Sequence, residues 1–407
     1  MLEKLVFLAI CSLPLYVLRV PIFGLPTTLL EVLIVLSVFF WVFTHFRSGS
    51  RFLGVLEAFK TPLFWPSLLL LFFGAVSIFS SSDPWRGLGI YRAFFLEPWL
   101  LFHLAFSVYK DKPRQIFNAL LLSGWLVALP ALWQGLTGQA LFSSAEHEVI
   151  QGRVASFYNS ANSVALYLGP LTALLISYLF KPLFPQRRWF YYLSFLVFVV
   201  CLFLTKSLGA WVGISLVFSL YLVFYLVKTR SYLQRVLFQA LVLGLFLTSI
   251  VFLLFLANIS TFTPKTALSY PRPYESTDMV RLCLWEGTRE LLLAKPILGA
   301  GLNGFPQAYS EYRTCDTELF QYPHNLFLNF WVEVGLGGLL SILVLVGVYW
   351  RLISRSSLEP MLKIGIVSFL LYLFFHGLFD VPYFKNDLSG EFWVYLAFGL
   401  TFVQKDS

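Results

Sequence analysis

The chain of 407 residues is 58% hydrophobic and only 12% charged, and its mean hydropathy is +0.76. It is far more apolar than a soluble domain of this length, so the composition excludes an ordinary soluble enzyme and predicts an integral membrane protein. The formal net charge of +8 does not indicate nucleic-acid binding, because the basic residues lie mainly in short segments between apolar runs.

Apolar runs of about 17 to 25 residues, enough to cross the hydrocarbon layer, predict about twelve transmembrane helices in an all-α, polytopic fold. The first run lacks the small-residue cleavage site of a secretory signal peptide, so we interpret it as a helix. The whole chain, 1–407, is then one integral membrane domain. In chain order, the runs cover approximately residues 4–20, 27–46, 62–80, 90–107, 115–135, 160–180, 189–205, 208–227, 235–257, 324–350, 362–380 and 388–403.

The distribution of lysine and arginine predicts the orientation of these helices. Short cytoplasmic segments retain positive charge, and the basic residues concentrate on one side if the N-terminus is inside. Both termini are then cytoplasmic, and residues 258–323 form one large outer loop between the ninth and tenth helices. We expect the protein in the cytoplasmic (inner) membrane of a bacterium, with its functional site on the outer face.

The outer loop has two parts with different character. Its beginning is rich in proline, which disfavours a regular helix, whereas residues 278–294 predict an amphipathic helix lying over the outer mouth of the bundle. Pro296 and a glycine-rich turn end that helix. One side of it carries Leu282, Trp285, Leu292 and Leu293, and the other carries Glu286, Arg289 and Glu290, with Arg289 expected to pair with Glu286.

Two of the four cysteines, Cys283 and Cys315, share this outer loop. A disulfide bond between them is compatible with an oxidising compartment. Two free thiols are equally compatible, because the loop has no second cysteine pair.

His324 precedes the tenth apolar run, in the sequence YPHN, and the chain has only five histidines. We expect it in the first turn of that helix, with Pro323 at a position that proline favours. The partial positive charge of a helix N-terminus disfavours imidazolium, so the ring is expected to be neutral and able to accept a proton. A catalytic base is one interpretation, and an interfacial polar group at the membrane boundary is the alternative.

Other polar residues lie at the same outer helix ends, and several are cations. Such a cluster needs an anion, and a phosphate or diphosphate is the natural candidate. Asn162 is alternatively a helix cap, and Lys385 an interfacial anchor. The cluster comprises Arg153, Asn159, Asn162, Lys206, Ser207, Arg281, Asp380 and Lys385.

Six motifs in a fixed order resemble the O-antigen ligase and O-antigen polymerase superfamily. They are G-R-x-x-S-F-x-N-x-x-N at 152–162, T-x-S-x-G-A at 205–210, R-x-x-x-W at 281–285, P-x-L-G-x-G-x-x-x-F at 296–305, and both H-N-x-x-L and E-x-G-x-x-G within 324–338. The resemblance covers about residues 150–390. The resemblance rests on the order of the six motifs, on their predicted location on the same side of the membrane, and on the large loop between the ninth and tenth helices.

The resemblance implies a metal-independent, inverting glycosyltransferase of the GT-C type that uses a polyprenyl-diphosphate-linked glycan as donor. His324 would be the general base and Arg281 would bind the diphosphate. Arg153 and Lys206 are further donor-binding candidates. The family usually has arginine after the serine of its T-x-S-R-G-A motif, whereas this chain has Leu208 there, so Lys206 would supply the charge as a point cation. We expect acceptor-binding or supporting roles for Asn325, Asn162 and Asp380.

The expected partners are the lipid bilayer, the lipid-linked oligosaccharide donor, and a glycan, lipid or protein acceptor. No metal or other cofactor is expected, since diphosphate is a good leaving group and the chain lacks a dense carboxylate cluster. A polymerase of lipid-linked repeat units differs only in its acceptor. A flippase or transporter is the alternative of another class, for which Glu333, within the tenth apolar run, is the main argument.

Overall fold

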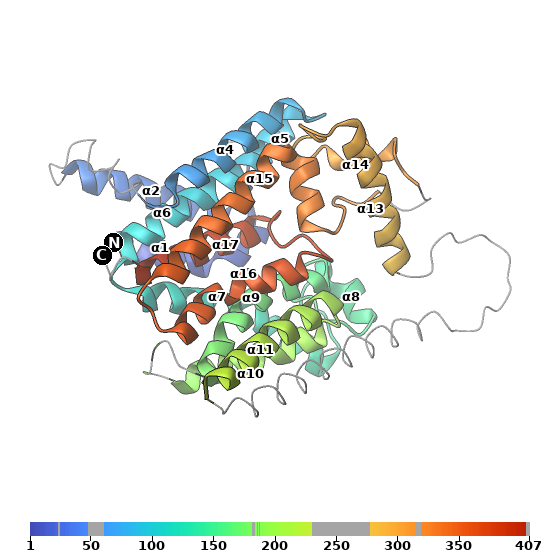
Figure 1. Cartoon of the computed structure of the whole chain (residues 1–407). Helices are drawn as coiled ribbons and strands as arrows, with labels where there is room; N and C mark the ends of the chain where they lie inside the picture. Colours follow the sequence, from blue (N-terminus) through green and yellow to red (C-terminus); the bar gives the residue numbers. More distant parts are fainter. Residues whose placement is uncertain are drawn as a thin grey trace, which may run out of the picture.

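The computed structural model describes residues 1–22, 25–47, 61–180, 184, 186, 188–229, 277–314 and 319–403 (Figure 1). In these ranges the chain is almost entirely helical, which confirms the predicted all-α class. The elements are α1 (Leu2–Cys11), η1 (Leu13–Val17), β1 (Arg19–Ile22), β2 (Leu25–Thr28), α2 (Leu29–Arg47), α4 (Phe64–Phe79), α5 (Pro84–Tyr91), η2 (Arg92–Leu96), α6 (Glu97–Tyr109), α7 (Pro113–Thr137), η3 (Ser143–Ala145), α8 (Glu146–Ile150), α9 (Ala161–Phe180), α10 (Arg188–Leu204), α11 (Leu208–Thr229), α13 (Thr277–Ala294), α14 (Phe305–Ser310), α15 (Leu326–Arg355), α16 (Pro360–His376) and α17 (Asn386–Val403).

Three of the described helices, α7, α9 and α15, are long and apolar enough to cross a membrane. Five shorter apolar helices, in α2, α4, α10, α11 and α16, accompany them. The count of twelve transmembrane helices therefore stays a prediction. Its ninth member, residues 235–257, lies outside the described residues, as does the loop segment 258–276.

The first predicted span was wrong as a single helix. The α-helix stops at Cys11, a 3-10 turn follows, and β1 (Arg19–Ile22) and β2 (Leu25–Thr28) are the two antiparallel strands of a hairpin, with Arg19 opposite Thr28. Proline explains the break, because Pro14 and Pro21 each lack the N–H that a continuing helix requires. The hairpin ends in a capping box, where Thr28 and Glu31 exchange hydrogen bonds between backbone N–H groups and side chains.

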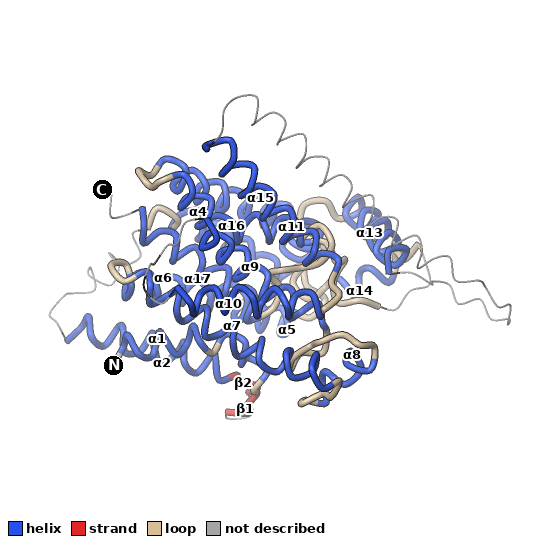
Figure 2. The backbone as a smooth tube through the Cα atoms, turned by 90° about the horizontal axis from the view of Figure 1, so that it is seen from below, coloured by secondary structure: helices blue, strands red, loops and turns tan. Residues whose placement is uncertain are grey.

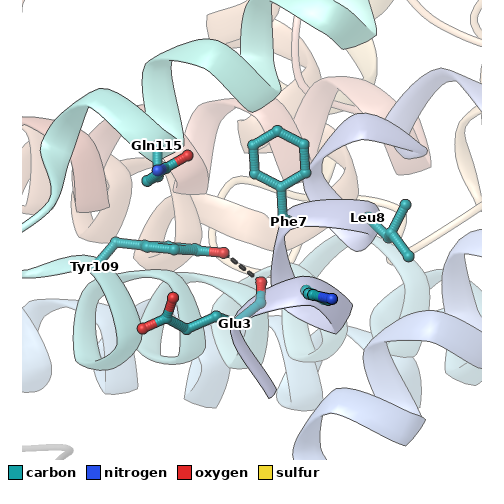
Figure 3. Close-up of a pocket in the computed structure, with 6 residues that line it drawn as sticks. Glu3, Phe7, Leu8, Tyr109 and Gln115 are labelled. Carbon is teal, nitrogen blue, oxygen red and sulfur yellow. Dashed lines mark hydrogen bonds between the residues drawn. The ribbon is translucent and has the colours of Figure 1, made fainter. Parts of the chain in front are cut away.

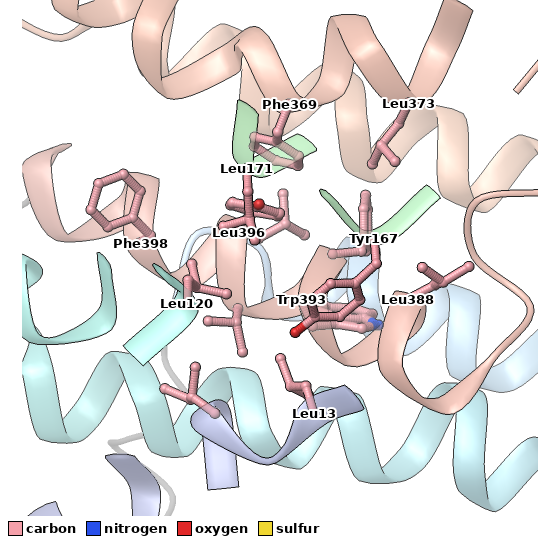
Figure 4. Close-up of a cluster of buried hydrophobic side chains, with 14 of the residues drawn as sticks. Leu13, Leu120, Tyr167, Leu171, Phe369, Leu373, Leu388, Trp393, Leu396 and Phe398 are labelled. Atoms are coloured by element: carbon pink, nitrogen blue, oxygen red, sulfur yellow. The ribbon is translucent and has the colours of Figure 1, made fainter. Parts of the chain in front are cut away.

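The α9 helix forms the centre of the bundle. Its apolar stretch is 89% buried, and it packs against α7, α10, α11 and α16. Side chains from η1, α7, α9, α16 and α17 meet in the core, where Tyr167 and Trp393 lie among leucines and phenylalanines (Figure 4). These contacts hold α9 and α16 next to one another.

The two ends of the bundle differ. Both chain termini are marked at one end, and α8, α13 and α14 lie at the opposite end in both views (Figures 1 and 2). The segments before α9, α11 and α15 and after α16 carry the predicted site residues. The same end of the bundle therefore gathers the polar motifs, as their sidedness in the sequence predicts.

The α13 helix occupies the segment where the sequence predicts an amphipathic helix, and its buried face matches the expected one in part, because Leu292 is buried and Trp285 packs against the same cluster. Leu284 and Leu291 are fully buried against α14 and α15, whereas Leu282 and Leu293 are exposed. Arg289 pairs with its neighbour Glu290, at 3.0 Å, and not with Glu286. Cys283 forms a disulfide bond, while Cys11 and Cys201 are free thiols; Cys315 lies outside the described residues.

The glycine-rich turn after α13 packs directly on α15. The Ala300 N–H donates to the Val332 carbonyl, and the Leu336 N–H donates to the Ile297 carbonyl. Gly335 is non-helical, with φ 80° and ψ 175°, so α15 breaks where the turn crosses it. A side chain there would be strained and would meet the Ile297 carbonyl at 2.6 Å. This contact explains the glycine in the E-x-G-x-x-G motif.

Candidate active site

His324 lies immediately before α15. The expectation that it occupies the first helical turn was wrong, because the helix begins at Leu326 and Asn325 is its N-cap. The Asn325 side chain accepts hydrogen bonds from the backbone N–H groups of Phe327 and Leu328, which satisfies two of the donors at the helix start. Pro323 is accordingly outside the helix. His324 itself has φ 49°, a left-handed conformation that is uncommon for residues other than glycine.

His324 and Asp380 form a hydrogen-bonded pair. The Nδ1 atom of His324 lies 3.2 Å from Oδ1 of Asp380. An ionised carboxylate can only accept, so Nδ1 carries the hydrogen and Nε2 presents its lone pair. The His324 side chain is 27% exposed, and the described part of the chain offers no hydrogen-bond partner to Nε2. The pair thus provides an oriented imidazole with an open basic nitrogen, which is the usual arrangement of a histidine base.

Asp380 is held ionised by its surroundings. Burial by itself would raise the pKa of this carboxyl group, but its hydrogen bond to His324, the charges of His324 and His376, and the Val381 N–H together hold its pKa well below the usual range. The Val381 N–H donates to the same oxygen as His324, at 2.9 Å. Asp380 therefore stays a carboxylate wherever His324 can be neutral.

A chain of polar contacts leads to the Asp380 oxygen that His324 does not contact. The Asn162 amide nitrogen donates to Oδ2 of Asp380 at 3.1 Å, and its carbonyl oxygen accepts from Nη2 of Arg153 at 3.0 Å. Arg153 also donates from Nε to the Thr205 carbonyl and pairs through Nη1 with Glu148. The alternative of Asn162 as a helix cap is not observed, because both ends of its amide face other side chains. All three nitrogens of the Arg153 guanidinium are engaged by the protein.

The loop before α11 places Lys206 beside this network. Lys206 has φ 52°, and its ammonium group lies over Gly152, 3.3 Å from the place that a Cβ would occupy there. Gly152 also has a positive φ, of 70°. Lys206 is exposed, and no ion pair of its side chain occurs within the described ranges. The strained backbone on both sides holds a solvent-facing cation next to Arg153.

Hydrogen bonds join the start of α15 to the end of α16. The Leu326 N–H donates to the Gly377 carbonyl at 2.7 Å, and the Asn325 side chain donates to the Leu378 carbonyl at 3.2 Å. The two segments carrying His324 and Asp380 are thus joined by the backbone as well as by the pair itself. Asn325, predicted as a supporting residue, caps α15 and also bonds the segment after α16.

Two further groups lie close to Asp380. The ammonium group of Lys385 donates to the Ser163 hydroxyl at 2.5 Å, one residue from Asn162. Burial lowers the pKa of Lys385, and the charges of Asp387 and Asp380 oppose that shift. His376 lies one turn before Asp380, and Arg281 on α13 is within electrostatic range of His376. The charge of Arg281 on the outer helix therefore acts on the same region.

Glu333 has a structural role in this fold. Its carboxylate accepts hydrogen bonds from the backbone N–H groups of Asn303, at 2.5 Å, and Phe305, at 3.3 Å. Phe305 is the first residue of α14, so Glu333 fixes the glycine-rich turn and the start of that helix. The side chain is 1% exposed. Glu333 therefore gives no indication of a transport pathway, because its side chain already accepts from backbone donors.

Sequence reasoning missed two buried supporting residues. Glu148, on α8, pairs with Arg153 at 3.0 Å. Gln134, inside α7, accepts from the N–H groups of Ala155 and Ser156 and so fixes the turn that follows Arg153. Neither residue stands out in the sequence, since Glu148 is one of two nearby acids and Gln134 lies within an apolar run.

A different hollow, of about 380 Å³, opens at the other end of the bundle. It is lined by residues of α1, α6 and α7, and there the Tyr109 hydroxyl donates to the Glu3 carbonyl (Figure 3). Lys112 pairs with the Glu3 side chain at 2.6 Å on the same exposed surface. It lies beside the chain terminus, so it belongs to the end opposite His324.

Comparison with known proteins supports the motif analysis. The O-antigen ligase family model matches residues 193–343, a region that contains Lys206, Arg281 and His324. A protein of Rickettsia typhi named "Putative polysaccharide ligase" is 25% identical over 194 residues, which is 44% of this chain and 44% of that protein. The chain thus matches less than half the length of this curated relative. The two matches confirm the resemblance to the O-antigen ligase superfamily.

Proposed function

We propose that this chain is a member of the O-antigen ligase superfamily and that it transfers a glycan from a polyprenyl-diphosphate carrier to a hydroxyl group of an acceptor. The observation that carries the proposal is the pairing of His324 with Asp380, which leaves Nε2 open at the end of the bundle where the cations gather. A glycan ligase-like activity is what the family match supports. The identity of the donor, the reaction mechanism and the side of the membrane go beyond that match, and we propose them here.

In the proposed reaction, Nε2 of His324 takes the proton of the acceptor hydroxyl as its oxygen attacks the anomeric carbon of the donor glycan. A bond forms from this oxygen to the anomeric carbon, and the bond from that carbon to the diphosphate oxygen breaks. The polyprenyl diphosphate leaves with the electron pair, and the configuration at the anomeric carbon inverts. Asp380 stabilises the imidazolium that results, as the carboxylate of a hydrolytic triad does.

Cations around the site would stabilise the negative charge that develops on the leaving diphosphate. Arg281 and Lys206 suit that role, since the charge of Arg281 on α13 acts on His376 and Lys206 is exposed. Arg153 suits a different role from the expected one. With Glu148, Asn162 and the Thr205 carbonyl occupying its nitrogens, it positions Asn162 and thereby Asp380.

The proposal places the reaction at the outer face of the cytoplasmic membrane. Support comes from the basic residues of the opposite helix ends and from the two chain termini, which share one end of the bundle (Figure 1). The acceptor is left as a glycan, lipid or protein hydroxyl, and polymerisation onto a second lipid-linked repeat is the same chemistry with another acceptor.

Transfer by the purified protein in lipid nanodiscs tests the proposal. The donor would be a polyprenyl-diphosphate oligosaccharide, offered with candidate acceptors, and the products would separate a ligase from a polymerase. His324→Ala should lower turnover by roughly 10²-fold to 10⁴-fold while donor binding persists. His147→Ala is the matched control, because His147 is an exposed histidine on α8 at the same end of the bundle. Lost donor binding with unchanged turnover would instead make His324 a binding group.

A further inference from the structure

Tyr372 and His376 form a buried, hydrogen-bonded pair on α16, just before Asp380. The Tyr372 hydroxyl donates to the Ala165 carbonyl of α9 at 2.9 Å. A hydroxyl group has a single hydrogen, so its oxygen must accept from Nδ1 of His376, at 2.8 Å. The other nitrogen of the neutral ring, Nε2, is then unprotonated. Tyr372 therefore fixes both the tautomer and the orientation of the His376 ring.

Three glycines, Gly169 on α9 and Gly209 and Gly213 on α11, make room for this pair, and we call them the glycine socket. A Cβ on Gly169 would overlap the Tyr372 ring, and one on Gly213 would lie 3.0 Å from it. A Cβ on Gly209 would lie 2.5 Å from Cδ2 of His376 and 2.8 Å from Nε2. These glycines are thus required for space. Because Gly209 is the glycine of the T-x-S-x-G-A motif, the His376 ring explains its presence there.

His376 connects two parts of the candidate site. Its backbone carbonyl accepts from the Asp380 N–H at 3.0 Å, so it fixes the turn that carries the carboxylate. Its ring lies against the first turn of α11 at Gly209, three residues after Lys206. The connection is short and ordered, since the Ser207 N–H donates to the Thr205 hydroxyl at 3.2 Å. A displaced His376 ring would therefore move either the Lys206 loop or the Asp380 turn.

Apolar packing alone does not explain a histidine in this place. Buried imidazole and phenol groups lose their hydration, and their hydrogen bonds only offset that cost, whereas leucine or phenylalanine would fill the space without it. The polar pair adds one fixed ring orientation, which an apolar side chain would not specify as strictly. The charges of Asp380 and Arg281 both act on His376, so the residue belongs electrostatically to the site.

We propose that His376 is a positioning residue of the transfer reaction, an inference that rests on the function proposed above. Held in the glycine socket, it sets the spacing between Lys206, which meets the donor diphosphate, and Asp380, which orients His324. This spacing matters because the leaving diphosphate and the attacking hydroxyl lie on opposite sides of the anomeric carbon. A misplacement of about 1 Å between such groups is enough to lower a rate by roughly 10²-fold.

A steric substitution opposite His376 tests this role. Gly209→Ala presses a methyl group against the imidazole, so it should lower kcat by roughly tenfold to a hundredfold and raise the donor KM. Gly347→Ala is the matched control, because a Cβ on that α15 glycine would meet no atom within 4 Å. Both constants are expressed per folded molecule, with melting temperatures measured in nanodiscs. A lower melting temperature with wild-type kcat and KM would make the contact purely structural and would overturn the proposal.

A double variant shows whether the effect passes through His376. His376→Ala should itself lower kcat, but adding Gly209→Ala should then cost nothing more, because the ring that the methyl group displaces is gone. Effects that multiply in the double variant would instead show two independent sites and would overturn the proposal. Tyr372→Phe keeps the socket filled and removes only the hydroxyl. It should lower kcat by about threefold to tenfold, as expected for the loss of one hydrogen bond.

A binding measurement keeps the test separate from transfer. The probe is a polyprenyl diphosphate without sugar, titrated against the protein in nanodiscs. Gly209→Ala should weaken its binding by about tenfold, because the Lys206 contact is displaced, and Gly347→Ala should leave it unchanged. If Gly209→Ala weakened binding but the wild type transferred no glycan to any acceptor, the proposed function would be refuted while His376 kept its positioning role at the diphosphate. Unchanged binding together with unchanged kcat would refute the role of His376 alone.

Discussion

Asn162 donates a hydrogen bond to Asp380 over 3.1 Å, although 218 residues separate them. This contact joins the start of α9 to the loop after α16, and Arg153 holds the other end of the same amide. The orientation of His324 thus depends on Asn162 through Asp380, without any contact between Asn162 and the substrate.

The first prediction concerns Asn162. Asn162→Leu keeps the volume but leaves Asp380 Oδ2 and Arg153 Nη2 without their partner, which is costly for buried polar groups. Turnover should fall by roughly tenfold to a hundredfold, less than on loss of the base itself, with the donor KM nearly unchanged. Gln151→Leu is the control, because Gln151 is exposed on the same loop and lies outside the motif. A raised donor KM with normal turnover would show instead that Asn162 contacts the substrate.

The second prediction concerns pH. Transfer by the wild-type protein should fall as acidification protonates His324, because imidazolium cannot accept the hydroxyl proton. The lowered pKa of Asp380 means that its contribution to stability is present above the pKa of an unfolded aspartate and is lost only as the pH falls through its own low value. Activity should therefore disappear while the fold persists, measured as initial rate and melting temperature across the acidic range. If the initial rate and the melting temperature fell over the same pH range, the result would contradict the assignment of His324 as the base.

Sequence periodicity and composition predict much of the fold. Apolar runs mark most of the helices, and the sidedness of Arg153, Lys206, His324 and Asp380 follows from the alternation of helix direction. The N-terminal hairpin could not be predicted in the same way, because the run 4–20 is apolar enough for a helix and the prolines alone do not specify strand pairing.

The contacts within the site are less accessible to sequence reasoning. His324 and Asp380 are both visible as polar residues at helix ends, but their pairing depends on which helices pack together. Glu333 is the clearest case, since an acid inside an apolar run indicates a transport pathway until its partners are known. Those partners are backbone N–H groups of a turn thirty residues earlier, which side-chain patterns do not reveal.

The third prediction compares two arginines of α13. Arg281→Ala should abolish transfer if Arg281 meets the diphosphate, and Arg281→Lys should be poorly active, because an ammonium group cannot form a bidentate contact. Arg289→Ala should leave transfer nearly intact, since Arg289 is exposed and pairs with Glu290 on the helix surface. Equal and mild losses in both variants would contradict the assignment of Arg281.

The fourth prediction compares two lysines. Lys206→Asn removes the charge but keeps a residue that tolerates the left-handed backbone at this position. Donor affinity should fall by roughly tenfold to a hundredfold, as expected for loss of one contact to a charged group, and Lys206→Arg should retain most of it. Lys295→Asn should have little effect, because Lys295 is exposed just after α13. Identical behaviour of the two asparagine variants would exclude Lys206 from donor binding.

The last prediction separates the enzyme from a transporter through Glu333. Glu333→Gln keeps one acceptor oxygen, but it replaces the second with an amide NH2 group that cannot accept from the Asn303 or Phe305 N–H. We expect a loss of about 1 to 3 kcal/mol in stability, seen as a lower melting temperature. Transfer per folded molecule should stay near the wild-type rate, because the carboxylate acts on the turn before α14 and not on the substrate. Movement of lipid-linked glycan across proteoliposomes should be absent in both proteins. If the wild type moved the glycan and Glu333→Gln blocked that movement with the fold intact, the transport interpretation would regain its basis and Glu333 would be its central residue.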